Sequence, residues 1–167
     1  MTAGGPILVV HLEDDPHDAE LVRETLRRIG LEVDLLLAAS RAEFVAALGR
    51  RTPHLILSDY NLPDFDGLSA LALSRELHPE VPFILVSGTI GEDRAIDVLK
   101  NGARDYVLKE RLDKLPIACR RALKEAEGHR RAEVERRGMG RAPRSLNREA
   151  RERRAPMRWR PGRRLRR

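Results

Sequence analysis

The sequence predicts an α/β fold in which helices cover a parallel sheet. Short apolar runs typical of buried strands alternate five times with segments whose apolar residues recur at helical spacing. Strands that alternate with helices form βαβ units, whose right-handed crossovers favour a parallel sheet. Four of the runs also end directly on acids, a hydroxyl or a lysine. Because the carboxyl ends of parallel strands form a ligand crevice, this pattern predicts a site at one edge of the sheet.

Boundary residues define the first two helices. Asp15 followed by Pro16 is typical of an N-cap and the first helical position, and Gly30 ends this helix where glycine is favoured. Ser40 and Glu43 form a capping box at the start of the second helix. The strands before these helices are expected at about residues 7–12 and 32–38.

The same alternation continues three more times along the chain. A strand over about 54–58 is followed by a loop rich in turn-forming residues, 61–67, and by a helix over about 67–78. The remaining strands are expected at about 83–87 and 104–108, and the remaining helices at about 92–101 and 112–126. Pro116 is tolerated in the first turns of the last helix.

The net charge of +6 averages two unlike parts of the chain. Residues 1–127 hold 16 Lys and Arg against 22 Asp and Glu, a net of −6, whereas residues 128–167 hold 16 Arg against 4 Glu, a net of +12. Beyond residue 127 glycine and proline interrupt the pattern and apolar residues are scarce, which is typical of disorder. We expect a folded domain at 6–127 and a basic tail at 128–167, with frayed helix to 137 and disorder from 138.

Composition narrows the class of protein further. The single cysteine, Cys119, cannot form an internal disulfide, and no apolar run approaches the roughly 20 residues that a membrane span needs. Nothing at the N-terminus resembles a signal peptide. These features favour a soluble, cytoplasmic protein. The five histidines show no metal-ligand spacing, and His11 is expected to be a packed, hydrogen-bonded core residue.

Four motifs at the predicted strand ends resemble the response-regulator receiver domain of two-component signalling, the CheY-like superfamily. They are Glu13-Asp14-Asp15-Pro16, the segment 58–67, Val86-Ser87-Gly88 and the segment 105–109. The likeness covers roughly residues 6–125. It implies a flavodoxin-like, doubly wound sheet of five parallel strands in the order 2-1-3-4-5, with five helices. That order would bring Asp14 next to Asp59.

The resemblance implies Mg²⁺-dependent phosphoryl transfer at these strand ends. Asp59 would be the phosphoacceptor, which takes a phosphoryl group from a phosphohistidine of a sensor histidine kinase or a phosphotransfer protein. Asp14, Asp59 and the backbone carbonyl of Asn61 would hold Mg²⁺, with Glu13 acting mainly through water. Lys109 would pair with a phosphoryl oxygen.

The resemblance also implies a conformational switch. Ser87 would hydrogen-bond the phosphoryl group and Tyr106 would change rotamer, which remodels the face formed by the fourth helix, the fifth strand and the fifth helix. That face would contact a downstream output protein or a second copy of the chain. Asn61 and Thr89 would tune the lifetime of the acyl phosphate. Where many receivers have a proline after a cis bond, this chain has Glu110, so a trans bond is expected.

Three classes of function remain open at this point. The first is a phospho-switch, either stand-alone or a receiver module truncated from a multidomain sensor or hybrid kinase. The second is a regulator that binds nucleic acid through its basic tail, where Trp159 lies between two arginines. The third is an enzyme proper, such as an aspartate-nucleophile phosphatase. Such enzymes carry a second acid two residues after the nucleophile, and the Asn61 found there counts against this class. We therefore expect a switch that catalyses only its own phosphorylation and dephosphorylation.

Overall fold

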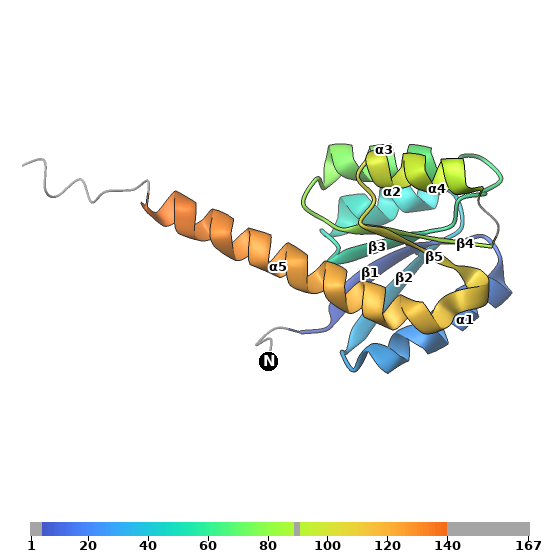
Figure 1. The fold of residues 1–167 in the computed structure, drawn as a ribbon, viewed down its shortest axis with the longest axis horizontal. Coiled ribbons are helices and arrows are strands. Elements are labelled where there is room, and N and C mark those ends of the chain that lie inside the picture. Colours follow the sequence, from blue (N-terminus) through green and yellow to red (C-terminus); the bar gives the residue numbers. More distant parts are fainter. Residues whose placement is uncertain (1–4, 89–90, 140–167) are drawn as a thin grey trace, which may run out of the picture. The chain divides into compact units, whose positions relative to one another are not determined.

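The computed structural model describes residues 5–88 and 91–139. Within these residues, five parallel strands form one sheet in the order β2-β1-β3-β4-β5 (Figure 1), which confirms the predicted doubly wound, flavodoxin-like fold. The strands are β1 Ile7–Leu12, β2 Val33–Ala38, β3 Leu55–Ser58, β4 Phe83–Ser87 and β5 Asp105–Leu108. The helices are α1 Pro16–Leu26, α2 Arg41–Arg50, α3 Gly67–Leu77, α4 Glu92–Lys100 and α5 Leu115–Met139. Two 3₁₀ segments, η1 Arg27–Ile29 and η2 Lys109–Lys114, follow α1 and β5.

Helices cover both faces of the sheet (Figure 1). Helices α2, α3 and α4 pack on one face and contribute Phe44, Leu71 and Val98 to its apolar cluster. Helices α1 and α5 pack on the other face, with Val22 and Cys119 in the second cluster. Because successive side chains of a strand point to opposite faces, the central strands feed both clusters and are almost completely buried.

The local boundary signals are confirmed at the residues that carry them. The Asp15 carboxylate accepts hydrogen bonds from the backbone N–H groups of His17 and Asp18, at 2.8 and 3.2 Å. The Ser40 hydroxyl accepts from the backbone N–H of Glu43 at 3.2 Å. Gly30 ends η1 with φ of 74°, a left-handed conformation that glycine adopts without a Cβ clash.

Helix α5 extends two residues beyond the predicted frayed helix and reaches Met139. Ala126 is its last buried residue, residues 128–139 are exposed, and an Arg137–Glu133 ion pair at 2.6 Å spans its last turn. The first compact unit ends at His129. The domain boundary at residue 127 stays a prediction. Disorder is predicted from residue 138, and the part of that segment from residue 140 on lies outside the described residues.

Two further expectations about single residues have different outcomes. The described residues contain no cis peptide bond, so the trans bond between Lys109 and Glu110 is confirmed. The expectation that His11 is hydrogen-bonded is wrong: the residue is completely buried, and neither ring nitrogen has a hydrogen-bond partner among the described residues. The side chain lies in the middle of the sheet, on β1, where its neighbours in register are Leu37 and Leu57.

Within residues 5–88 and 91–139, none of the helices combines the length and the apolar character that crossing a membrane would require.

Candidate functional site

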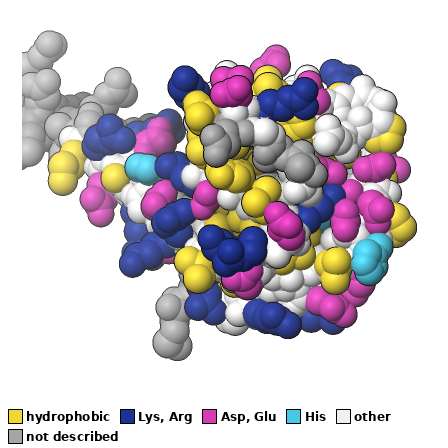
Figure 2. Space-filling view, turned by 45° about the vertical axis from the view of Figure 1, so that its right-hand side comes forward, with side chains coloured by type: hydrophobic (Ala, Val, Ile, Leu, Met, Phe, Trp, Pro, Cys, Tyr) yellow, Lys and Arg dark blue, Asp and Glu magenta, His cyan; other side chains and the backbone are white. Residues whose placement is uncertain are grey.

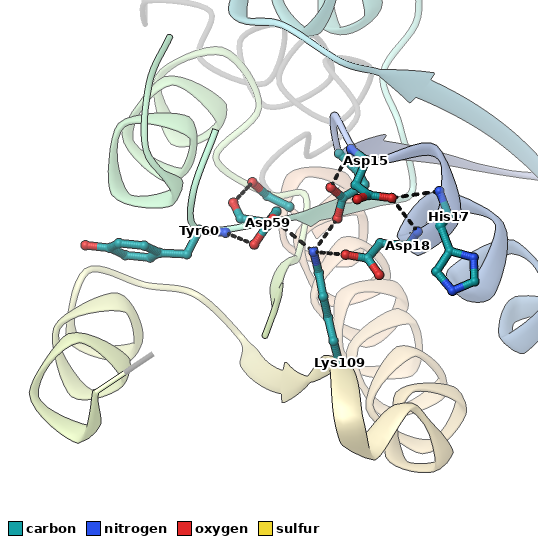
Figure 3. A network of polar contacts seen from close by, with 8 residues as sticks. Asp15, His17, Asp18, Asp59, Tyr60 and Lys109 are labelled. Atoms are coloured by element: carbon teal, nitrogen blue, oxygen red, sulfur yellow. Dashed lines mark hydrogen bonds and ion pairs between the residues drawn. The ribbon is translucent and has the colours of Figure 1, made fainter. Parts of the chain in front are cut away.

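The acids and the lysine predicted at the strand ends meet at one edge of the sheet (Figure 3). Strands β1 and β3 are neighbours in the sheet, so Glu13 and Asp14, which follow β1, lie beside Asp59, which follows β3. Carboxylate oxygens of these three residues lie within 4.8 Å of one another. Lys109 directly follows β5 and reaches into the same cluster. The geometry therefore joins residues that are up to 96 positions apart, from 13 to 109.

The Lys109 ammonium group lies at the centre of this cluster. Its Nζ donates hydrogen bonds to Oδ2 of Asp18 at 2.7 Å and to Oδ2 of Asp59 at 3.0 Å, and it forms an ion pair with Oε2 of Glu13 at 2.8 Å. Burial by itself would lower the pKa of Lys109, but the three carboxylates outweigh it and hold this pKa above its ordinary value. Lys109 is therefore charged at every physiological pH.

Glu13 is a buried acid that depends on this cation. Only 1% of its side chain is exposed, and burial raises its pKa above the ordinary value for glutamate. The contact with Lys109 and a hydrogen bond from the backbone N–H of Asp15 to Oε1, at 2.9 Å, oppose that rise without cancelling it. The charged form of Glu13 thus requires a positive charge next to it, supplied by Lys109 or by a metal ion.

The Asp59 carboxylate is held in a fixed orientation. The backbone N–H of Tyr60 donates to Oδ1 at 2.6 Å, while Lys109 holds Oδ2. The backbone N–H of Asp59 itself donates to the carbonyl of Leu12 at 2.9 Å, which ties β3 to the end of β1. Asp14 is exposed, so the cluster is open to solvent on its side. A set of carboxylate oxygens this close together fits a hard dication such as Mg²⁺.

The remaining predicted residues lie at different distances from solvent. Ser87, the last residue of β4, is 1% exposed, and its hydroxyl has no hydrogen-bond partner among the described residues. A buried hydroxyl without a partner is destabilising, so it is available to a group that enters the site. Tyr106 on β5 is 39% exposed. Asn61 is exposed in the loop, where its backbone forms an isolated antiparallel β-bridge with Asp66. Thr89 lies outside the described residues.

Sequence reasoning missed Asp18. This residue lies in the first turn of α1, 91 positions before Lys109, and makes the shortest contact that Lys109 has. An acid in the first turn of a helix is common because the positive end of the helix dipole stabilises its negative charge. Because this general reason already explains Asp18, the sequence gives no indication that its partner is Lys109.

The loop that positions Asp59 is closed by a tight contact at Gly67. The backbone N–H of Gly67 donates to the carbonyl of Tyr60 at 2.8 Å. A Cβ at this position would lie 2.9 Å from Cδ1 of Leu85, 2.9 Å from Cα of Tyr60 and 3.1 Å from the carbonyl of Asp59. Since two of these atoms belong to the backbone, the loop itself would have to move.

We expect Gly67→Ala to lower the free energy of unfolding by about 2 kcal/mol, as overpacking a buried position does. Gly49→Ala is the matched control, because a Cβ at Gly49 has nothing within 4 Å and lies inside α2. That control should be unchanged or slightly more stable. Urea denaturation of both variants measures the difference, and equal stability of Gly67→Ala and the unmodified protein would show that the loop has room.

Comparison with known proteins adds independent observations. A family model described as the response regulator receiver domain matches residues 7–119. The regulatory protein LuxO of Vibrio cholerae is 30% identical over 116 residues, covering 69% of this chain and 25% of LuxO. The response regulator protein FleR of Pseudomonas aeruginosa is 33% identical over 122 residues, covering 72% of this chain and 25% of FleR. This chain therefore spans a quarter of the length of these relatives.

Solved structures show the same architecture. A CheY-like receiver domain protein from Methanospirillum hungatei superposes with a TM-score of 0.66 at 25% identity, covering 75% of this chain and 99% of that one. NtrX from Brucella abortus superposes with a TM-score of 0.72 at 25% identity, covering 83% of this chain and 31% of NtrX.

Proposed function

Because this chain belongs to the response regulator receiver domain family over residues 7–119, we propose that it is a Mg²⁺-dependent phospho-switch of two-component signalling. The phosphoryl donor would be the phosphohistidine of a sensor histidine kinase or a phosphotransfer protein, and the acceptor would be Asp59. The observation that carries this proposal is the convergence of Lys109 with Glu13, Asp14 and Asp59 at one edge of the sheet.

The proposed chemistry uses the carboxylate of Asp59 as the nucleophile. A carboxylate oxygen of Asp59 attacks phosphorus, the new oxygen–phosphorus bond forms, and the bond to the donor nitrogen breaks. Asp14, Asp59 and the backbone carbonyl of Asn61 would hold Mg²⁺, with Glu13 acting through water, and the ion would neutralise charge on the phosphoryl oxygens. Lys109 supplies a second positive charge from the protein itself.

The switch that follows would use the buried hydroxyl of Ser87. A phosphoryl oxygen on Asp59 offers Ser87 the acceptor that it lacks among the described residues. Movement of Ser87 would be coupled to the rotamer of Tyr106, with Asn61 and Thr89 affecting how fast water removes the phosphoryl group. The output face formed by α4, β5 and α5 carries exposed apolar side chains, Ile96 and Leu99 among them, which suits a downstream protein or a second copy of this chain.

Phosphorylation is tested by intact mass after incubation with acetyl phosphate and Mg²⁺. We expect a single phosphoryl adduct that disappears in Asp59→Asn and in EDTA. Asp64→Asn is the control, since Asp64 is an exposed acid of the same loop that accepts from the backbone N–H of Arg41. It should keep the adduct. An adduct that persists in Asp59→Asn, or no adduct on folded protein, would reject the proposal.

Two alternatives to a stand-alone phospho-switch rest on other features of the chain and its relatives. The first alternative is a receiver module of a longer, multidomain protein, since the regulators LuxO and FleR are about four times as long as the segment that they share with this chain. Binding to nucleic acid would depend on residues 128–167 with their net charge of +12. The body does not favour it, because acidic side chains are scattered over the face in Figure 2 and residues 1–127 carry −6. A salt-sensitive affinity for DNA that is lost on deleting 128–167 would support that alternative.

A further inference from the structure

The Lys109 ammonium group has three N–H groups and three carboxylates around it. It donates hydrogen bonds to Asp18 and Asp59 and forms an ion pair with Glu13. The proposed function requires Lys109 to pair with a phosphoryl oxygen on Asp59. A phosphoryl oxygen on Asp59 can take over the N–H that Asp59 now receives, and any further phosphoryl oxygen at the ammonium group competes with Glu13 and Asp18 for the other N–H groups. The structure therefore raises the question of which acid Lys109 releases, and this inference rests on the proposed function.

Burial separates the three acids. The side chain of Glu13 is 1% exposed and that of Asp59 is 9% exposed, whereas that of Asp18 is 29% exposed. Releasing Glu13 would leave a buried charge without a partner, which is strongly destabilising. Water can solvate the freed carboxylate of Asp18. The backbone N–H groups in the first turn of α1 also favour a negative charge there, even without Lys109.

We propose that Asp18 is a positioning residue for Lys109, and that it gives up this lysine when Asp59 is phosphorylated. In the unphosphorylated protein, Asp18 ties the first turn of α1 to the segment that follows β5, and α1 contacts η2 beside this tie. Phosphorylation exchanges the tie for a bond between Lys109 and a phosphoryl oxygen. Asp18 thus competes with the phosphoryl group for the same cation, and α1 loses one of its attachments in the phosphorylated state.

The competition predicts a direction for the rate. Asp18→Asn keeps the size of the side chain but removes the charge that competes for Lys109. We expect the adduct to form about two- to fivefold faster in this variant, the size expected for losing one partly exposed ion pair. Glu20→Gln is the matched control, because Glu20 is an exposed acid of α1 that pairs with Arg23 and not with Lys109. Its rate should equal that of the unmodified protein.

A spectroscopic measurement separates release from a merely structural role. The ¹⁵N signal of the Lys109 ammonium group is recorded with and without Mg²⁺ and beryllofluoride, a phosphoryl mimic. We expect it to differ between Asp18→Asn and the unmodified protein in the free state and to coincide in the loaded state. Glu20→Gln should match the unmodified protein in both states.

Three results would overturn the inference while leaving the proposed function intact, provided that the unmodified protein forms its Asp59-dependent adduct in the same assay. They are a slower or unchanged rate in Asp18→Asn, an unchanged ammonium signal in the free state, and a difference that persists in the loaded state. If the unmodified protein forms no adduct, the proposed function and this inference fail together.

Discussion

Replacing Lys109 with methionine is expected to lower the free energy of unfolding by about 3 kcal/mol at pH 7 in EDTA, as breaking a buried ion pair does. Methionine preserves most of the aliphatic stem of the lysine but removes the ammonium group. Glu13, Asp18 and Asp59 then lose the cation they share, and Glu13 has only 1% of its side chain exposed to water. The unpaired charge of Glu13 accounts for most of the expected loss.

The loss should depend on pH in a defined direction. Burial already raises the pKa of Glu13, and the contact with Lys109 is one of the effects that oppose the rise, so this pKa rises further in Lys109→Met. A carboxyl whose pKa is higher in the folded state binds more protons there than in the unfolded state. Folding is then favoured below the ordinary pKa of glutamate and weakened as pH rises through the folded value. Lys109→Met should therefore lose more stability at pH 8 than at pH 5.

Urea denaturation at the two pH values measures this difference. Lys114→Met is the matched control, because Lys114 is an exposed lysine of the same 3₁₀ segment. It should change the stability by no more than about 0.5 kcal/mol. Adding Mg²⁺ should restore part of the stability of Lys109→Met, since an ion that binds only the folded protein stabilises it. Equal losses in the two variants would mean that Lys109 does not neutralise Glu13.

The parts of the fold that the sequence predicts well are those fixed by neighbouring residues. Asp15, Ser40 and Gly30 act within one turn of their own helix, so their roles are readable from spacing. The convergence of Asp59 and Lys109 also follows from general topology, because parallel strands end at one edge. The order of the strands came from the family resemblance and is confirmed.

The parts that sequence reasoning missed depend on contacts between distant residues. Asp18 meets Lys109 only because the first turn of α1 and the end of β5 lie side by side, and nothing local reports that. Gly67 looks like an ordinary turn residue until Leu85 of β4 is placed against it. The length of α5 was underestimated because Gly128 is unfavourable in a helix by about 1 kcal/mol, which the surrounding helix-forming residues outweigh.

His11 shows the same limit, because its neighbours in the sheet, Leu37 and Leu57, come from strands that are distant in the sequence. The sequence predicts a hydrogen-bond partner for a histidine inside an apolar strand, yet both ring nitrogens of His11 lack one among the described residues. Burial, followed by the nearby charges of Lys109 and Arg23, lowers the pKa of His11 from 6.5 to about 4, while Asp18 acts weakly in the opposite sense. His11 is therefore neutral in the folded protein at neutral pH and becomes charged in the unfolded chain below its ordinary pKa.

This difference sets the direction of the pH dependence. A lowered pKa means that the folded state binds fewer protons, so the stability is fully present above pH 6.5 and is lost as pH falls towards about 4. One pKa unit corresponds to about 1.4 kcal/mol, so His11 should account for a loss of roughly 2 kcal/mol between pH 7 and pH 5. Leucine at this position has no proton to bind and no polar atom to leave unpaired.

We expect His11→Leu to be about 1–3 kcal/mol more stable than the unmodified protein at pH 7, because it removes a buried polar group without a partner. Its advantage should grow by roughly 2 kcal/mol at pH 5, where the unmodified protein has lost the contribution of neutral His11. Urea denaturation in EDTA at both pH values gives the two differences. His17→Gln, a change of an exposed histidine on α1, is the control and should stay within about 0.5 kcal/mol of the unmodified protein at both pH values. If the stabilities of His11→Leu and the unmodified protein fall in parallel from pH 7 to pH 5, then His11 is not the residue that makes the fold sensitive to acid. Another group must then supply that sensitivity. Asp15 is one such group, because hydrogen bonds from the backbone N–H groups of Asp18 and His17 lower its pKa.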